Sequence, residues 1–169
     1  MGTTVIRKLL LTAMTFCIAL SSGAWAAEPI KIGTTQALSG HYQEFGTEQL
    51  RGLQMWVADV NARGSLLGRP VTLIHYDDAS RNANAEAGVK KLVEQDGVDL
   101  LVGPYSSALT LRASAVAEEL GVPMIASAAS ADEIWERGYR NIFGVDTLAS
   151  NYLEGFRAAR DAGASSLAL

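Results

Sequence analysis

Short apolar runs alternate with segments of helical period along most of this chain, and no other feature constrains the fold as strongly. Between the runs, apolar residues recur at helical spacing, as in Leu50, Leu53, Val57 and Val60. Strands separated by helices of this length pair in parallel, with right-handed crossovers. The sequence therefore predicts an α/β fold, a Rossmann-like parallel sheet with helices on both faces. The predicted strands are residues 30–34, 71–76, 99–102, 124–126 and 141–144.

Ligands of such sheets bind outside the carboxyl ends of the strands, where the connecting loops gather. Four loops are therefore candidates for a binding site: residues 36–46, 77–82, 103–108 and 127–131. The pair Asp77-Asp78, in the second of these loops, is interpreted as a turn and helix entry rather than a metal or phosphoacceptor site.

Two serines stand where the third strand turns into the next helix. Ser106 and Ser107 fall at the predicted helix start, where unpaired backbone N–H groups and the positive end of the helix dipole attract anions. Either hydroxyl could instead only cap the helix. The spacing alone leaves both interpretations open.

The loop after the fourth strand is also built from small and hydroxyl residues. Ser130 and Glu133 have the spacing of a capping box, while Ala128 and Ala129 would let backbone groups approach a ligand closely. Neither this loop nor residues 103–108 contains Lys or Arg, so two such helix starts suit a carboxylate better than a phosphate.

The remaining composition argues against several classes of function. The chain lacks a P-loop, a G-x-S-x-G nucleophile motif and an H-E-x-x-H zinc motif, so no catalytic or metal-binding constellation is predicted and an exported enzyme is the least favoured alternative. Its 18 acidic residues outnumber 14 basic ones and neither sign is clustered, which argues against nucleic acid as a partner.

The first 26 residues have the features of a cleavable signal peptide. Arg7 and Lys8 precede an apolar run at 9–20 that is too short to span a bilayer, and Ala24 and Ala26 offer a cleavage site. We therefore expect export to the periplasm and a mature chain without cysteine, since Cys17 is the only one. Such a chain uses neither disulfides nor thiolate metal sites.

Several short motifs, taken in order, resemble the periplasmic binding proteins of branched-chain amino-acid uptake systems. Each motif alone is weak, but their order and spacing cover essentially the whole mature segment. They are Ile-Lys-Ile-Gly at 30–33, Leu-Ser-Gly at 38–40, Phe45 before Gly46, Asn-Ala-Arg-Gly at 61–64, Gly-Arg-Pro at 68–70, Tyr-Asp-Asp at 76–78, Gly-Pro-Tyr-Ser-Ser at 103–107 and Gly-Tyr-Arg at 138–140.

This resemblance implies two Rossmann-like lobes that close on a small ligand and deliver it to an ABC permease of the inner membrane, without a cofactor. Residues 1–26 would be the signal peptide, 27–145 the first lobe, and 146–169 the crossover and the start of a second lobe. We expect a longer protein, because 167–169 resemble the start of a strand. The sensing domain of a receptor is an alternative with the same fold.

The resemblance also assigns residues. Ser107 matches the hydroxyl that binds the ligand carboxylate, Ala128 a position of backbone contacts, and Ser130 a hydroxyl at the amino-acid head group. Phe45 matches an aromatic of the side-chain pocket. Tyr105, Ser106 and Ala129 belong to the same two loops.

Two positions depart from the pattern. Ala149 stands where several amino-acid binders carry an Asp near the ligand's ammonium, so aromatic or other amine-free carboxylic acids are alternatives to leucine-like ligands. Ser80 and Ser106 occupy the positions of a disulfide that some members have.

Overall fold

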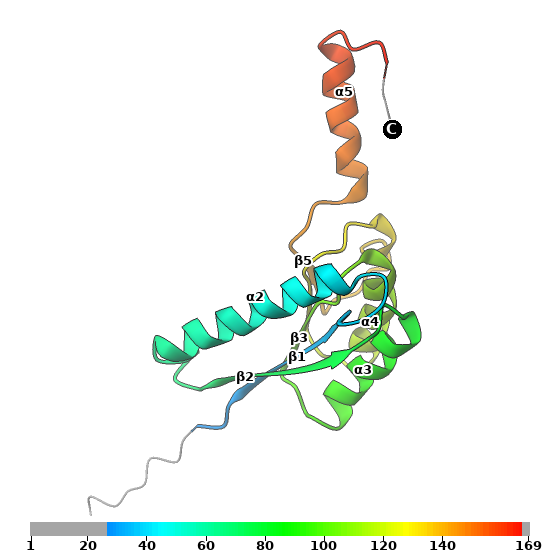
Figure 1. Ribbon diagram of the computed structural model, residues 1–169. Helices are drawn as coiled ribbons and strands as arrows, with labels where there is room; N and C mark the ends of the chain where they lie inside the picture. Colours follow the sequence, from blue (N-terminus) through cyan, green and yellow to red (C-terminus); the bar gives the residue numbers. More distant parts are fainter. Residues whose placement is uncertain (1–26, 167–169) are drawn as a thin grey trace, which may run out of the picture.

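The computed structural model describes residues 27–166 of the 169-residue chain (Figure 1). The signal peptide predicted for residues 1–26 and the strand start predicted for 167–169 lie outside this range. None of the helices in the described range is long and apolar enough to cross a membrane.

The described chain forms one five-stranded sheet in which every neighbouring pair of strands is parallel. The strands lie in the order β2-β1-β3-β4-β5. This arrangement confirms the predicted parallel α/β fold. The strands are β1 (Ile30–Gln36), β2 (Val71–Asp77), β3 (Leu100–Val102), β4 (Met124–Ala126) and β5 (Ile142–Gly144).

Helices cover both faces of the sheet, as predicted (Figure 1). The α-helix α2 (Gln43–Ala62) packs against β1 and β2, whereas α3 (Asn82–Glu94) packs against α4 (Ser107–Glu119) and β1. Successive strand residues point to opposite faces. Ile32 accordingly lies with the α2 residues Leu53 and Val57, while Gly33 contacts Leu92 of α3. The short helices η1 (Asp132–Ile134) and η2 (Ala149–Tyr152) and the helix α5 (Leu153–Asp161) follow.

The larger core lies between the sheet and α3 and α4. Leu92, Leu101, Met124 and Ile134 are each at most 2% exposed there. Burial of this apolar area is the main driving force that holds the two helices on the sheet. A smaller cluster of Ile30, Ile32 and Val71 lies under α2.

The α2 face of the sheet is only partly covered within residues 27–166. A groove of about 360 Å³ beside α2 is lined entirely by apolar residues, which are Ile32, Leu53, Trp56, Val57, Leu66, Leu73, Leu100, Val102 and Ile125. Next to it on β5, Phe143 is 56% exposed. The apolar strands predict burial on both faces, but Ile125 of β4 and Phe143 of β5 stay exposed, because α2 packs against β1 and β2.

The loop after β1 is shorter than the sequence suggests. The sequence predicts a loop that extends to residue 46, but α2 begins at Gln43, so Phe45 and Gly46 lie in the first turn of the helix. Gly46 permits this early start, because a Cβ there would lie 2.4 Å from the carbonyl oxygen of Ala37. The helix can therefore begin directly against the end of β1.

Candidate functional site

The loops at the carboxyl ends of β1 and β3 leave the sheet in opposite directions. The chain after β1 enters α2 on one face, and the chain after β3 enters α4 on the other. Such a reversal between adjacent strands is the topological switch point, the usual ligand position in open α/β sheets.

An aromatic cluster joins these two loops. The ring of Phe45 stacks on that of Tyr105, with 4.7 Å between centroids and 5° between planes. Tyr42 approaches the same Tyr105 edge-on at 5.5 Å. Phe45 remains 52% exposed, so the stacked pair presents an apolar wall to solvent. Tyr42 is not predictable as a site residue, because a lone tyrosine in a loop belongs to no sequence pattern.

The loops after β3 and β4 are joined by main-chain hydrogen bonds. The Ser106 N–H donates to the carbonyl of Ala128 over 3.1 Å, beside a parallel bridge between Tyr105 and Ala128. The Ser107 hydroxyl oxygen accepts the N–H groups of Ser130, at 3.2 Å, and of Ala131, at 3.1 Å. The structure thus brings together Tyr105, Ser106, Ser107, Ala128 and Ser130, with Phe45 joined through Tyr105.

The two serines of α4 have different roles. Ser106 is the N-cap residue, and its hydroxyl oxygen accepts the N–H of Leu109 at 3.4 Å. Ser107 does not cap its own helix; its hydroxyl reaches across to the next loop. The capping role that the sequence left open for this pair therefore belongs to Ser106.

The capping box predicted for Ser130 and Glu133 is wrong. The residue that precedes η1 is Ala131, and no side chain caps this short helix. In a capping box the Ser130 N–H would bind the Glu133 carboxylate. Here that N–H donates to the Ser107 hydroxyl instead.

Ala129 lies beneath the loop rather than on it. It is 2% exposed and belongs to the larger core together with Met124 and Ile134. Its small side chain anchors residues 127–131 against the sheet while Ala128 and Ser130 stay half-buried.

The segment after β5 returns to the same loop. The Ala149 N–H donates to the carbonyl of Ser130 over 2.6 Å. The N–H and hydroxyl of Ser150 both donate to the Asp132 carboxylate, each with a distance of 3.2 Å. Ala149, the position where the resemblance expects an acidic residue, therefore borders the candidate site. No sequence motif marked Asp132.

Asp77 and Asp78 organise the turn after β2, which agrees with their interpretation from the sequence. Partial burial disfavours the charge of Asp77, but hydrogen bonds from the Ser39 hydroxyl and from the N–H groups of Ala79 and Leu38 outweigh it and lower its pKa. Burial raises the pKa of Asp78 to about 6, although the Ser80 N–H binds one of its oxygens. Within residues 27–166 no group of three His, Cys, Asp or Glu side chains is placed to hold a metal.

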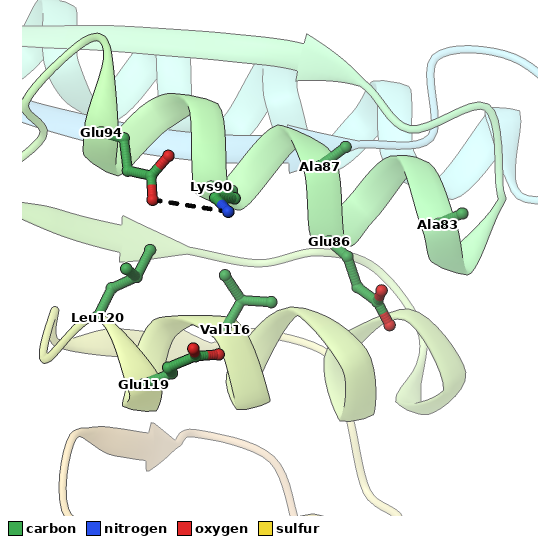
Figure 2. A pocket seen from close by; sticks show the side chains of 8 residues that line it. All are labelled: Ala83, Glu86, Ala87, Lys90, Glu94, Val116, Glu119 and Leu120. Atoms are coloured by element: carbon green, nitrogen blue, oxygen red, sulfur yellow. Dashed lines mark ion pairs between the residues drawn. The ribbon is translucent and has the colours of Figure 1, made fainter.

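Two pockets lie beside the helices that follow the candidate loops. One, of about 240 Å³, is lined by Gln49, Gly52, Leu53, Val102 and Ser127, and so reaches the residue directly before Ala128. The other, of about 390 Å³, lies between α3 and α4 (Figure 2). None of the predicted site residues lines it, and its Lys90–Glu94 ion pair, at 3.8 Å, is typical of a solvated helix surface.

Comparison with known proteins identifies relatives. Residues 29–169 match the family model described as periplasmic binding protein. The Leu/Ile/Val-binding protein of Escherichia coli strain K12 is 37% identical over 136 residues, which are 80% of this chain and 37% of that protein. The Leu/Ile/Val/Thr-binding protein of Salmonella typhimurium is 35% identical over 141 residues, 83% of this chain and 38% of that one. The chain thus spans little more than a third of the length of these relatives.

Solved structures of related proteins share the fold of this chain. The branched-chain amino acid transporter substrate binding protein of Streptococcus pneumoniae, in complex with isoleucine, is 32% identical with a TM-score of 0.69, covering 72% of this chain and 34% of that one. A solute binding protein of R. palustris in complex with 4-hydroxybenzoate, 23% identical, shares the fold with a TM-score of 0.70, covering 80% and 37%. The sequence and the parallel sheet are similar to those of branched-chain amino acid substrate-binding proteins, and the chain belongs to the periplasmic binding protein family.

Proposed function

We propose that the protein is an extracytoplasmic solute-binding protein that captures a small carboxylate-bearing ligand, in the first instance a branched-chain amino acid, for an ABC importer. The observation that carries the proposal is the hydrogen bonding of Ser107. Its oxygen accepts two backbone N–H groups, and within residues 27–166 no hydrogen bond uses its hydroxyl hydrogen.

A hydroxyl in this state is a good donor to a carboxylate. It has one hydrogen to give and two lone pairs to fill, and both lone pairs are already engaged. Two N–H donors polarise the O–H bond, which strengthens the bond it donates to a charged acceptor. The position at the first turn of α4 adds the favourable field of the helix N-terminus.

The remaining residues supply the other parts of a pocket. Ser106, Ala128 and Ser130 would surround the head group, with Ala129 anchoring their loop from the core. The stacked rings of Phe45 and Tyr105 would line the space for an apolar ligand side chain. Binding of this kind needs no catalytic step and no cofactor.

Residues 27–145 would form the first lobe and 146–169 the crossover and the start of the second. Two observations support this division. None of residues 146–166 is buried, and Tyr152, Leu153 and Phe156 expose apolar surface on η2 and α5. In Figure 1 α5 extends away from the sheet. A second lobe would cover this surface, complete the pocket and close over the ligand by a hinge motion. The signal peptide at 1–26, the periplasmic location and an inner-membrane permease belong to the same proposal.

A second ligand class is favoured by Ala149. It lies at the Ser130 carbonyl and offers no carboxylate to an ammonium, so aromatic or other amine-free carboxylic acids are the alternative. The fold admits both classes, since it occurs in the isoleucine complex from S. pneumoniae and in the 4-hydroxybenzoate complex from R. palustris.

A thermal-shift screen of the full-length mature protein tests the proposal. The probes are leucine, isoleucine, valine, phenylalanine, 4-hydroxybenzoate and short-chain fatty acids. A ligand at a hundredfold excess over its Kd stabilises the native state by about 2.7 kcal/mol, which raises the midpoint measurably. A shift with the aliphatic amino acids supports the first class, and a shift only with amine-free acids supports the second. No shift with any carboxylate would refute the proposed function.

A further inference from the structure

The turn after β2 packs directly against the loop after β1. Gly40 has φ +81°, and a Cβ on it would lie 2.7 Å from the Ala79 carbonyl oxygen and 2.9 Å from the Ser80 hydroxyl oxygen. Only a glycine fits this conformation and this spacing together. The backbones of the two segments are therefore in immediate contact, and displacement of one displaces the other.

Ser80 joins the two segments through hydrogen bonds of its hydroxyl group to the backbone of Tyr42 and Ser39. Its hydroxyl oxygen accepts the Tyr42 N–H at 2.9 Å, and its hydroxyl hydrogen is donated to the Ser39 carbonyl, also at 2.9 Å. The Asp77 carboxylate accepts two more hydrogen bonds from this loop, one from the Ser39 hydroxyl at 2.7 Å and one from the Leu38 N–H at 2.9 Å. Ser80 is the member of this network that binds Tyr42 itself.

The turn adopts an unfavourable backbone conformation to place this hydroxyl. Ala79 and Ser80 are consecutive non-glycine residues with positive φ, 51° and 58°. Residues with a Cβ adopt this region only where surrounding contacts enforce it, and such strain is concentrated at functional positions. Glycine would relieve the strain at position 80, but it would remove the hydroxyl.

The backbone at Tyr42 sets the direction in which α2 begins. Tyr42 is the N-cap residue of α2, and its own side chain does not cap the helix. Its ring contacts the Tyr105 ring edge-on, and Phe45, three residues later, stacks on the same Tyr105 ring. A change in the Tyr42 backbone therefore moves both rings relative to Tyr105.

We propose that Ser80 is a positioning residue for the ligand pocket: its hydroxyl fixes the Tyr42 backbone and thereby holds Tyr42 and Phe45 against Tyr105. This inference rests on the proposed function, because it assigns the aromatic cluster to the pocket. Ser80 itself need not contact the ligand.

The test compares Ser80→Ala with Ser65→Ala in the full-length mature protein. Ser65 is a matched control, since it is also a serine with positive φ, 74°, but stands in the turn after α2. Calorimetric titration uses leucine or 4-hydroxybenzoate, whichever shifts the wild-type midpoint. Ser80→Ala should weaken binding about three- to tenfold, the size of coupling usual for residues in one network, and Ser65→Ala should leave it unchanged.

A double-mutant cycle separates positioning from general destabilisation. If Ser80 acts through Tyr105, the loss caused by Ser80→Ala should largely disappear when Tyr105→Ala is already present. An equal loss in both backgrounds would overturn the inference, as would unchanged affinity of Ser80→Ala.

A ligand-independent measurement keeps this inference distinct from the proposed function. In a protein with isotope-labelled tyrosine rings, Ser80→Ala should move the NMR resonances of the Tyr42 and Tyr105 rings, and Ser65→Ala should not. Unmoved ring resonances would refute the positioning role even if a ligand binds. Moved resonances in a protein that binds no probe would refute only the proposed function.

Discussion

Replacement of Ser107 by alanine tests the site most directly. The substitution removes an oxygen that accepts the N–H groups of Ser130 and Ala131, and it removes the hydroxyl hydrogen assigned to the ligand carboxylate. The first loss acts on stability and the second on affinity, so the two can be measured separately.

The expected magnitudes follow from the number of hydrogen bonds. Two neutral bonds of about 0.5–1.5 kcal/mol each give a stability loss of about 1–3 kcal/mol. One bond to a charged carboxylate contributes about 1.5–3 kcal/mol, which corresponds to roughly 10- to 150-fold in Kd. Affinity should therefore fall by at least tenfold in a calorimetric titration of the full-length protein.

Ser114→Ala is a suitable control for this measurement. Ser114 lies two turns further along α4, is fully buried, and its hydroxyl accepts from Arg137 at 2.6 Å. Its loss should lower the melting temperature to a similar extent and leave affinity unchanged. If Ser107→Ala lowers stability but binds as tightly as wild type, Ser107 only joins the two loops and the carboxylate assignment is wrong.

Three further perturbations have defined outcomes. Phe45→Ala should lose the stacking on Tyr105, about 0.5–1.5 kcal/mol, and should weaken ligands with large apolar groups more than alanine-sized ones in competitive titrations. Gly46→Ala should destabilise the fold by about 1–3 kcal/mol in chemical denaturation, because its Cβ would lie 2.4 Å from the Ala37 carbonyl oxygen; an unchanged midpoint would show that α2 can shift freely. Burial raises the pKa of Asp78 from 3.8 to about 6, so its stability contribution is present at low pH and lost as the pH rises through about 6. Asp78→Asn should therefore gain up to about 3 kcal/mol relative to wild type as the pH rises from 3.8 to 7, and a pH-independent difference in thermal melts would contradict this.

The sequence predicts the strands and the sheet well because their signals are local. The run Met124–Ala126 has the bounds of β4, and β1 and β2 differ from expectation only in extending to Gln36 and Asp77. Apolar patterning and turn residues determine such elements. The sequence predicts a later start of α2 than the structure has, because the close approach that permits the early start is between Gly46 and Ala37, nine residues apart.

The sequence is sufficient to predict which loops form the candidate site, but not which residues of these loops contact one another. Parallel topology is sufficient to gather residues 103–108 and 127–131 at one edge of the sheet. The sequence does not tell which of the two serines caps α4, because this depends on the direction of the Ser130 N–H group. That N–H donates to the Ser107 hydroxyl, so Ser106 is the cap and the predicted capping box does not form. Three further residues belong to the site region only through tertiary hydrogen bonds or ring contacts, and such contacts produce no periodic pattern in a sequence. They are Tyr42, Ser80 and Asp132.

The hydrogen-bond donors and acceptors of the candidate site are not equally available to a ligand, and this affects which end of a ligand the site can bind. Within residues 27–166 no hydrogen bond uses the Ser107 hydroxyl hydrogen, whereas the carbonyls of Ala128 and Ser130 each already accept one N–H group, from Ser106 and Ala149 respectively. The nearby Asp132 carboxylate is bound by Ser150. We therefore expect the candidate site to bind the carboxylate end of a ligand in preference to its ammonium. We expect 4-methylpentanoate, which is leucine without its amine, to bind measurably, and 3-methylbutylamine, which lacks the carboxylate, not to bind. An amine that matched leucine in affinity would refute the assignment of the Ser107 hydroxyl to the ligand carboxylate.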